Sequence, residues 1–231
     1  MAHHRRPVSC CWQGLLAVPL ALFLFVLLIL YLFSPETARA QVRVPEIGEL
    51  SSPAEIPYDH ETMAPGLTAG RLVGSIEVDG VLNERAWQDA EPFSAFRQRE
   101  PVDGAPVSER TEVRILVGPD ALYIGAWLFD SEPDKIRATL VRRDVVSDFD
   151  YFYVNLDSRH DHNTAYAFTL TPSGAYQDAV RGTDGEYDFG WDPIWEGAAS
   201  VDGEGWYGEW RIPFSQLRFE TSDNPVWGLQ F

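Results

Sequence analysis

Tryptophans are the residues of this sequence whose chemistry most directly suggests a ligand. A tryptophan ring packs well against the C–H face of a pyranose, while nearby carboxylates and amides bind the sugar hydroxyls. Trp191 and Trp195 flank a proline-containing loop end, where we expect exposure, and Trp127 lies on the second face of a predicted strand. These three are the candidate carbohydrate-binding residues. Trp206 and Trp210 share one face of another predicted strand, so we expect them in the core, and core burial is the competing explanation for any single tryptophan.

Three aspartates form a second candidate site. Asp144, Asp148 and Asp150 lie within one short stretch. Calcium takes about six to eight oxygen ligands, commonly from loops, so this cluster is a candidate structural calcium site. The spacing does not match an EF-hand loop. The alternative is a solvated acidic loop whose charge is neutralised by the adjacent Arg142 and Arg143.

Other patterns of catalysis or metal binding are weaker. His160 and His162 could bind a transition metal, but they fall in a predicted turn with no third nitrogen or thiolate nearby, which favours a plain exposed turn. The sequence carries neither a G-x-S-x-G nucleophile motif nor a phosphate-binding loop. Two carboxylates across a cleft could hydrolyse a glycoside, but no such pair stands out. We therefore expect a protein that is not an enzyme.

The candidate residues depend on strands to position them. Residues 111–130 form two arms that alternate apolar side chains with a period of two, and Gly118-Pro119-Asp120 supplies a turn between them. More short strands follow at regular spacing, separated by Gly, Pro and Asp turns and with little helix. This pattern predicts an all-β fold, an antiparallel β-sandwich with a few short helices.

Several elements are predicted from shorter signals. We expect a strand over residues 72–78, ended by Asp79-Gly80, with Gly80 in a positive-φ conformation. Asn83 is the expected cap of a short helix whose Trp87 faces the core. Residues 133–140 are expected to form one or two helical turns, and residues 181–190 a polar loop.

The chain divides into a leader, a linker and one domain. Residues 1–40 contain an apolar helical run (residues 14–33) followed by Ala38-Arg39-Ala40, which predicts a signal peptide cleaved before Gln41 or, alternatively, a membrane anchor. Residues 41–69 are acidic and rich in proline, which is typical of a disordered linker. Residues 70–231 form the domain. Because the sequence ends inside a strand-like run, we expect this domain to be truncated at its C terminus.

The charge of the chain limits its partners. The formal net charge is -17 at pH 7. A strongly acidic protein repels phosphate backbones, so nucleic acid is excluded as an expected partner, whereas cations and neutral sugars remain compatible.

Several motifs occur together in a specific order and spacing. They are the Asp-Gly-x-Leu-Asn-Glu-x-x-Trp pattern ending at Trp87, Leu122-Tyr123-Ile124-Gly125, Arg142-Arg143-Asp144, Trp191-Asp192-Pro193-Ile194-Trp195 and the stretch from Ile212 to Phe219. With them, residues 70–231 resemble the family 9 carbohydrate-binding module (CBM9), and more narrowly the copies at the N terminus of bacterial outer-membrane β-barrel proteins. The resemblance implies a jelly-roll-like sandwich, structural calcium, a glycan or oligosaccharide ligand, and a barrel that normally follows in the same chain.

One position departs from the family's sugar-binding members. Those members carry a clamping tryptophan just before the strand that corresponds to residues 151–157, where this sequence has Val146, Ser147 and Phe149. The leading interpretation is an exported, non-catalytic carbohydrate-binding module of the periplasm, outer membrane or cell surface. Two alternatives stay open: a part of a glycoside hydrolase, and a structural or assembly domain without a small ligand.

Overall fold

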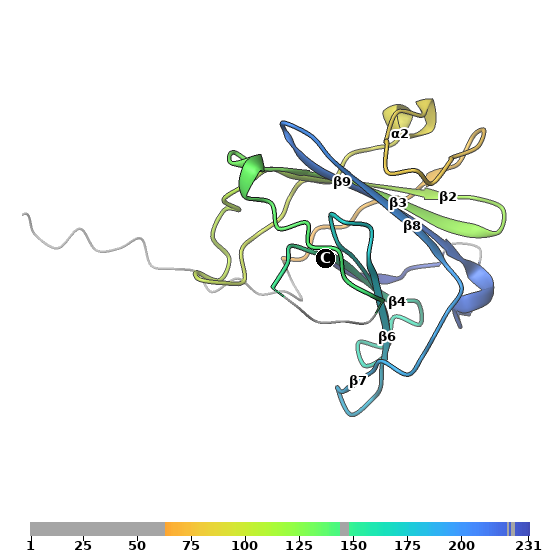
Figure 1. Ribbon diagram of the computed structural model, residues 1–231. Coiled ribbons are helices and arrows are strands. Elements are labelled where there is room, and N and C mark those ends of the chain that lie inside the picture. The colour runs from red at the N-terminus through yellow and green to blue at the C-terminus, as the bar shows by residue number, and fades with distance from the viewer. Residues whose placement is uncertain (1–62, 144–147, 221, 223–224) are drawn as a thin grey trace, which may run out of the picture. The chain divides into compact units, whose positions relative to one another are not determined.

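The structure, a computed structural model, describes residues 63–143, 148–220, 222 and 225–231 (Figure 1). All of these residues belong to one compact unit, Ile56–Phe231. The predicted leader with its apolar helix, and most of the predicted linker, lie outside the described residues. In the described part of the chain, no helix has the length and apolarity that crossing a membrane requires.

Two five-stranded sheets make up the described unit. The first sheet has the order β1 (Gly70–Arg71), β2 (Thr111–Val117), β3 (Ala121–Phe129), β9 (Gly205–Pro213) and β8 (Glu196–Val201). The second has the order β10 (Gly228–Gln230), β4 (Phe152–Asp157), β5 (Ala165–Leu170), β6 (Tyr176–Arg181) and β7 (Tyr187–Asp188). The helices are α2 (Arg85–Asp89) and the 3-10 turns η1 (Pro133–Lys135) and η2 (Phe214–Gln216). The predicted β-sandwich with few short helices is confirmed.

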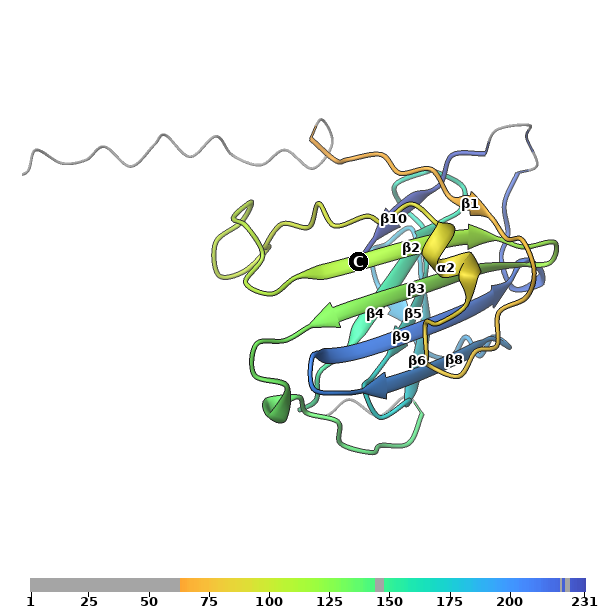
Figure 2. The same ribbon diagram turned by 90° about the horizontal axis from the view of Figure 1, so that it is seen from above.

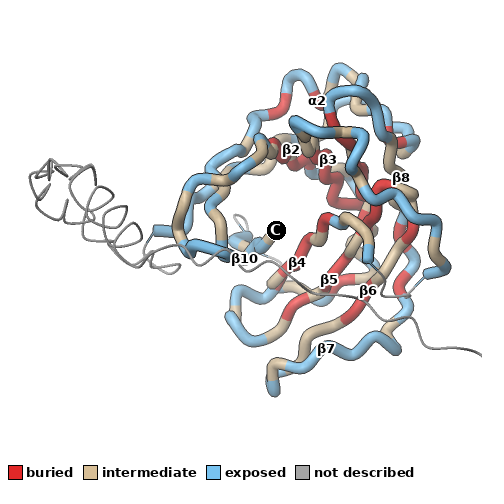
Figure 3. Tube along the Cα trace, turned by 60° about the vertical axis from the view of Figure 1, so that its left-hand side comes forward, coloured by how far each residue is buried: buried red, intermediate tan, exposed pale blue. Residues whose placement is uncertain are grey.

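The hydrophobic core lies between the facing sides of the two sheets, where buried residues of β2, β3 and β9 meet those of β4 and β5 (Figure 3). Alternation places Ile124 and Trp210 of the first sheet against Phe152 and Val154 of the second. The rings of Phe152 and Trp210 have centroids 5.7 Å apart. Trp206 and Trp210 are buried as predicted.

A separate segment covers the other side of the first sheet. Residues 72–90, including α2, run over β2 and β3 (Figure 2) and form a second apolar cluster around Trp87, which is fully buried there rather than between the sheets. Glu209 of β9, also fully buried, fastens this segment. It accepts hydrogen bonds from the backbone N–H groups of Asp79 (3.0 Å) and Gly80 (2.8 Å) and from Trp87 Nε1 (2.9 Å).

Gly80 has the predicted positive φ, at 83°. A Cβ atom added there would lie 2.7 Å from the backbone carbonyl carbon of Ala199. Both the conformation and the close approach of β8 therefore require glycine.

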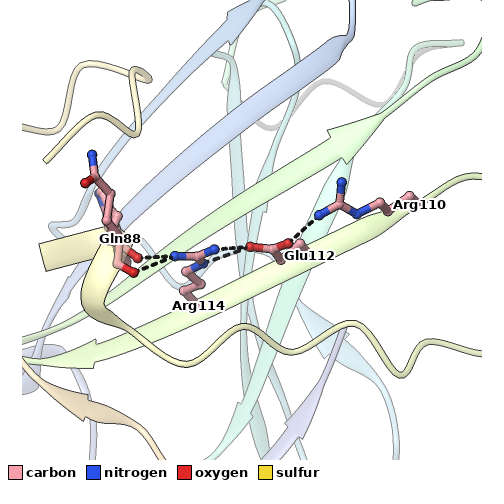
Figure 4. A network of polar contacts seen from close by, with 5 residues as sticks. Gln88, Arg110, Glu112 and Arg114 are labelled. Carbon is pink, nitrogen blue, oxygen red and sulfur yellow. Dashed lines mark hydrogen bonds and ion pairs between the residues drawn. The ribbon is translucent and has the colours of Figure 1, made fainter. Parts of the chain in front are cut away.

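An ionic network adds a second attachment for α2 (Figure 4). Arg114 Nη1 donates to the backbone oxygens of Trp87 (2.5 Å) and Gln88 (3.3 Å), and its Nη2 pairs with Glu112 Oε1 at 2.5 Å. Arg110 Nη2 pairs with Glu112 Oε2 at 2.8 Å. Because Glu112 is buried, both arginines neutralise a carboxylate that would otherwise be costly to place there.

Some of the shorter predicted elements are wrong. Residues 72–78 form no strand, because Gly74 adopts φ 92° and the chain runs over the sheet there; the strand β1 is confined to Gly70–Arg71, ahead of the predicted range. The helix of Trp87 begins after Glu84 rather than Asn83, and no side chain caps it. Leu67 and Ala69, which precede the predicted domain boundary, pack against the core.

Candidate functional site

The three candidate tryptophans do not form one site. Trp127 is half-buried on the outer side of the first sheet. Its ring meets Trp87 edge-on, with centroids 6.3 Å apart, and the Arg114 guanidinium lies 4.9 Å from its centroid. Trp191 and Trp195 lie near the second sheet, so Trp127 is separated from both by the sandwich itself.

Trp195 does not show the expected exposure. It is 6% exposed, and its ring lies against Tyr176 (centroids 4.6 Å apart) and Phe168 (5.4 Å). Its Nε1 donates to Asp178 Oδ2 at 3.2 Å. A ring held this way offers no free face to a sugar, because the strand that follows directs it into the core. Trp191 is half-buried and packs on Phe168, with centroids 5.7 Å apart.

Arg143 links two of the sequence motifs, its own Arg142-Arg143-Asp144 and the stretch from Trp191 to Trp195. Its Nη2 donates to Asp178 Oδ2 (2.6 Å) and to the backbone oxygen of Pro193 (3.2 Å), and it pairs with Asp192 Oδ1 at 2.8 Å. Asp178 is almost fully buried between the sheets. Arg143 therefore fixes the loop of Trp191 and Trp195 to the second sheet, which is a structural role.

The described carboxylates of the candidate calcium site are already neutralised. Arg137 pairs with both Asp148 and Asp150, and its backbone N–H donates to Asp150 Oδ2 at 2.8 Å. These aspartates raise the pKa of the Arg137 guanidinium. Arg143 pairs with Asp178 and Asp192, and its predicted part in neutralising this loop stays a prediction. Asp144 lies outside the described residues.

These contacts do not suit calcium as they stand. A calcium ion at Asp148 and Asp150 would have to displace the guanidinium that occupies them. Among the described residues, no group of three His, Cys, Asp or Glu side chains gathers as a metal site would require. The calcium site stays a prediction.

A different group of residues gathers on the outer side of the second sheet. The strand register brings Asn155 opposite Ala167 and Ala167 opposite Ala179, with Ala165 paired to Arg181 in the next row. The three alanines are nearly fully buried although they point away from the core. Something must therefore cover them.

The side chain of Tyr187 crosses this part of the sheet. Its hydroxyl lies 3.1 Å from Asn155 Nδ2, yet β6 and β5 lie between β7 and β4. Neighbouring strands are about 4.8 Å apart, so the two backbones are separated by roughly 14 Å in a flat sheet. A tyrosine side chain reaches only about 6.5 Å from its Cα. The Tyr187 side chain therefore extends across the outer side of β6 and β5 toward Asn155, and the residue is 39% exposed.

Further aromatic residues lie near Tyr187 and on the neighbouring part of β4. Phe189 stacks on Tyr187 with centroids 6.3 Å apart, and Tyr151 stacks on Tyr153 at the same separation. Phe189 and Tyr151 are 53% and 56% exposed. Burial, followed by the nearby hydroxyls of Tyr187 and Tyr151, raises the pKa of Tyr153, so its hydroxyl stays protonated at neutral pH as a hydrogen-bond donor.

Polar side chains lie between the rings. Asn155 Nδ2 also donates to Gln230 Oε1 at 3.2 Å, while the buried Asn155 Oδ1 accepts no hydrogen bond. Thr169 and Gln177 are paired on the same side of the sheet, beside Tyr153. We call this set of residues the outer face of the second sheet: Tyr151, Tyr153, Asn155, Thr169, Gln177, Tyr187, Phe189 and Gln230.

Sequence reasoning missed this face for an identifiable reason. The stretch of residues 181–190 reads as a polar, glycine-containing loop, yet it holds the two-residue strand β7 that carries Tyr187. The exposed rings of this face are also tyrosine and phenylalanine, whereas the residue type expected to bind a sugar was tryptophan. The signal available was the pattern Tyr151-x-Tyr153-x-Asn155, whose alternation places all three on one side of β4.

Comparisons with known proteins concern the fold. No family model matches the chain, and no curated protein matches it. A Bacteroides uniformis protein with a proposed carbohydrate-binding role aligns over 71% of this chain and 80% of its own, with a TM-score of 0.51 and 12% identity. Its likeness supports the β-sandwich fold. Two structures of a family 9 carbohydrate-binding module from Caldicellulosiruptor kristjanssonii, with glucose and with cellotriose, align at TM-scores of 0.47 and 0.48, with 16% and 14% identity, over 70% of this chain and 73% and 72% of theirs.

Proposed function

We propose that this protein is a non-catalytic carbohydrate-binding module whose ligand lies on the outer face of the second sheet. The observation that carries the proposal is Tyr187, whose hydroxyl reaches Asn155 across β6 and β5 while the residue stays 39% exposed. A flat, exposed aromatic ring on a rigid sheet matches the C–H face of a pyranose. The resemblance of the sequence motifs to family 9 modules supports the same class of ligand.

The neighbouring polar groups suit sugar hydroxyls. Asn155 Oδ1 is an acceptor without a partner, and the hydroxyl of Tyr153 is a donor at neutral pH. The rings contribute area and orientation, and these amide and hydroxyl groups contribute selectivity between sugars.

The same face gives no support to the hydrolase alternative. Glycoside hydrolysis uses two carboxyl groups about 5–10 Å apart across the scissile bond. Among the described residues that β4, β5 and β6 direct to this face, Asp157 is the one carboxylate. Its oxygens accept the backbone N–H groups of Arg159 (3.2 Å), Asp161 (3.2 Å) and His162 (2.8 Å), so they hold a turn together.

The cellular setting belongs to the proposal as well. Export rests on the apolar run and on Ala38-Arg39-Ala40, with an inner-membrane anchor as the alternative. Attachment to an outer-membrane protein rests on the narrower resemblance of the motifs. Mass spectrometry of the mature N terminus, expected at Gln41, distinguishes the signal peptide from the anchor.

Calorimetric titration with soluble cello- and xylo-oligosaccharides tests the function. We expect binding by the full chain and its loss in Tyr187→Ala, because that change removes an aromatic ring from the outer face of the second sheet. Trp127→Ala is the matched control, since it removes an aromatic ring from the first sheet. Binding that survives Tyr187→Ala and is lost in Trp127→Ala would move the site to the other sheet. Flat titrations with every oligosaccharide would favour the structural or assembly domain.

A further inference from the structure

The turn between β4 and β5 is held rigid from within. Asp157 accepts hydrogen bonds from three backbone N–H groups of this turn. Asp161 closes the turn, because its Oδ1 accepts from the backbone N–H groups of Asn163 (2.8 Å) and Thr164 (2.7 Å). Thr164 Oγ1 donates to Asp161 Oδ2 at 2.8 Å. These bonds lower the pKa of Asp161, so the closure persists at neutral pH.

Two histidines occupy unusual positions in this turn. His160 and His162 have φ angles of 51° and 58°, in the left-handed region that few non-glycine residues adopt and in which Asn, Asp and His are enriched. Both are exposed. Their imidazole centroids lie 4.7 Å apart, and within the described residues neither ring donates or accepts a hydrogen bond. Two unpartnered imidazoles are thus presented side by side by a backbone that is fixed on both sides of each.

The separation of the rings matches a two-imidazole chelate. A metal–nitrogen bond is about 2.0–2.1 Å, which places each ring centroid roughly 3.2 Å from the ion. Two cis ligands at a right angle then have centroids about 4.5 Å apart, and two ligands at the tetrahedral angle about 5.2 Å. The observed 4.7 Å lies between these values and nearer the first. Cis nitrogens in a square or tetragonal arrangement are typical of Cu²⁺ and Ni²⁺.

We propose that His160 and His162 form a surface site for a divalent transition metal ion, with Cu²⁺ bound most tightly. The two imidazoles supply two cis nitrogens, and water or a ligand from outside the chain fills the other positions. The order of affinities for a nitrogen site places Cu²⁺ above Ni²⁺ and Zn²⁺. This site is independent of the proposed carbohydrate function, because it shares none of the residues of the outer face of the second sheet.

Titration of the full chain with Cu²⁺ tests the site. Calorimetry measures the affinity and the number of ions bound, and electron paramagnetic resonance identifies the ligand atoms. The background carries His3→Ala and His4→Ala, since adjacent N-terminal histidines would also bind the ion. We expect one ion per chain and a spectrum with the splitting of two nitrogen ligands. His160→Asn and His162→Asn should each weaken binding roughly 10- to 100-fold, because each converts a chelate into a single ligand. Asparagine tolerates the left-handed conformation, so the turn should keep its shape.

The controls separate this site from adventitious binding. His60→Asn removes a histidine elsewhere in the chain and should leave the affinity unchanged. Circular dichroism spectra and melting temperatures of the two turn variants should match those of the background protein. A spectrum showing only oxygen ligands, or an unchanged affinity in His160→Asn and His162→Asn, would overturn the proposal, because the ion would then bind the acidic surface.

Discussion

The outer sides of the two sheets use aromatic residues in opposite ways. On the first sheet, Trp87 is fully buried under residues 72–90, and Glu209 and Arg114 fasten that segment. On the second sheet, the side chain of Tyr187 extends over the outer side toward Asn155 and remains 39% exposed. An aromatic residue on the outer side of a sandwich is therefore buried where another segment of the chain covers it, and stays accessible to a ligand where none does.

Trp87→Ala should produce the largest change, because it removes the centre of the closed side. Replacing a fully buried tryptophan by alanine costs about 3–5 kcal/mol of folding free energy. Urea denaturation measures the loss. Trp127→Ala, at a half-buried position in the same cluster, should cost clearly less. Equal small losses in both variants would mean that the segment over the first sheet contributes little to stability.

Gly80→Val tests the attachment of the same segment. The positive φ and the backbone of Ala199 both oppose a side chain, so we expect a loss of about 1–3 kcal/mol from the backbone strain alone. Gly203→Val is the matched control, because a Cβ atom there meets nothing within 4 Å. It should change the free energy of unfolding by less than about 0.5 kcal/mol. An unchanged melting temperature in Gly80→Val would contradict the assigned turn.

The pH dependence of Glu209 gives a smaller effect. Burial raises its pKa, outweighing the backbone N–H groups of Gly80 and Asp79 and the indole of Trp87, which lower it. A carboxylate whose pKa is higher in the folded state binds more protons there than in the unfolded chain. Its contribution to stability therefore falls as the pH rises through the window between the unfolded and folded pKa values, with a slope of at most about 1.4 kcal/mol per pH unit.

Glu209→Gln isolates this contribution. The free energy of unfolding of the unchanged protein, minus that of the variant, should decrease from about pH 4.5 upward and then level off. Denaturation curves across that range measure it. A difference that increases with pH would show that the three donors dominate over burial.

Tyr187→Ala should produce the smallest change in stability. Its ring is partly exposed, and Asn155 keeps its hydrogen bond to Gln230 when the tyrosine hydroxyl is lost. We expect a cost below about 1 kcal/mol, measured by the same denaturation assay. A loss as large as that of Trp87→Ala would make Tyr187 a core residue and remove the contrast between the two sides.

The sandwich was predictable because its signals are local. The alternation in residues 111–130 and the turn at Gly118 anticipate β2 and β3, and the buried Trp206 and Trp210 follow from the same period. The positive φ of Gly80 follows from its Asp-Gly turn. Each of these depends on a few neighbouring residues.

The site was less predictable because it depends on distant parts of the chain. A strand as short as β7 exists through its pairing with β6, which no local pattern encodes. Whether Trp195 is exposed depends on Phe168 and Tyr176, and whether the first sheet is covered depends on residues far ahead of β9. Residue type alone therefore could not distinguish a buried aromatic ring from an exposed one.

Hydroxyl-radical footprinting of the full chain, with and without a saturating oligosaccharide that binds, tests the central claim most directly. Exposed aromatic side chains are oxidised, and a bound sugar protects those that it covers. We expect protection of Tyr187, Phe189 and Tyr151, with oxidation of Trp127 unchanged. Protection of Trp127 while Tyr187 remains fully reactive would contradict it.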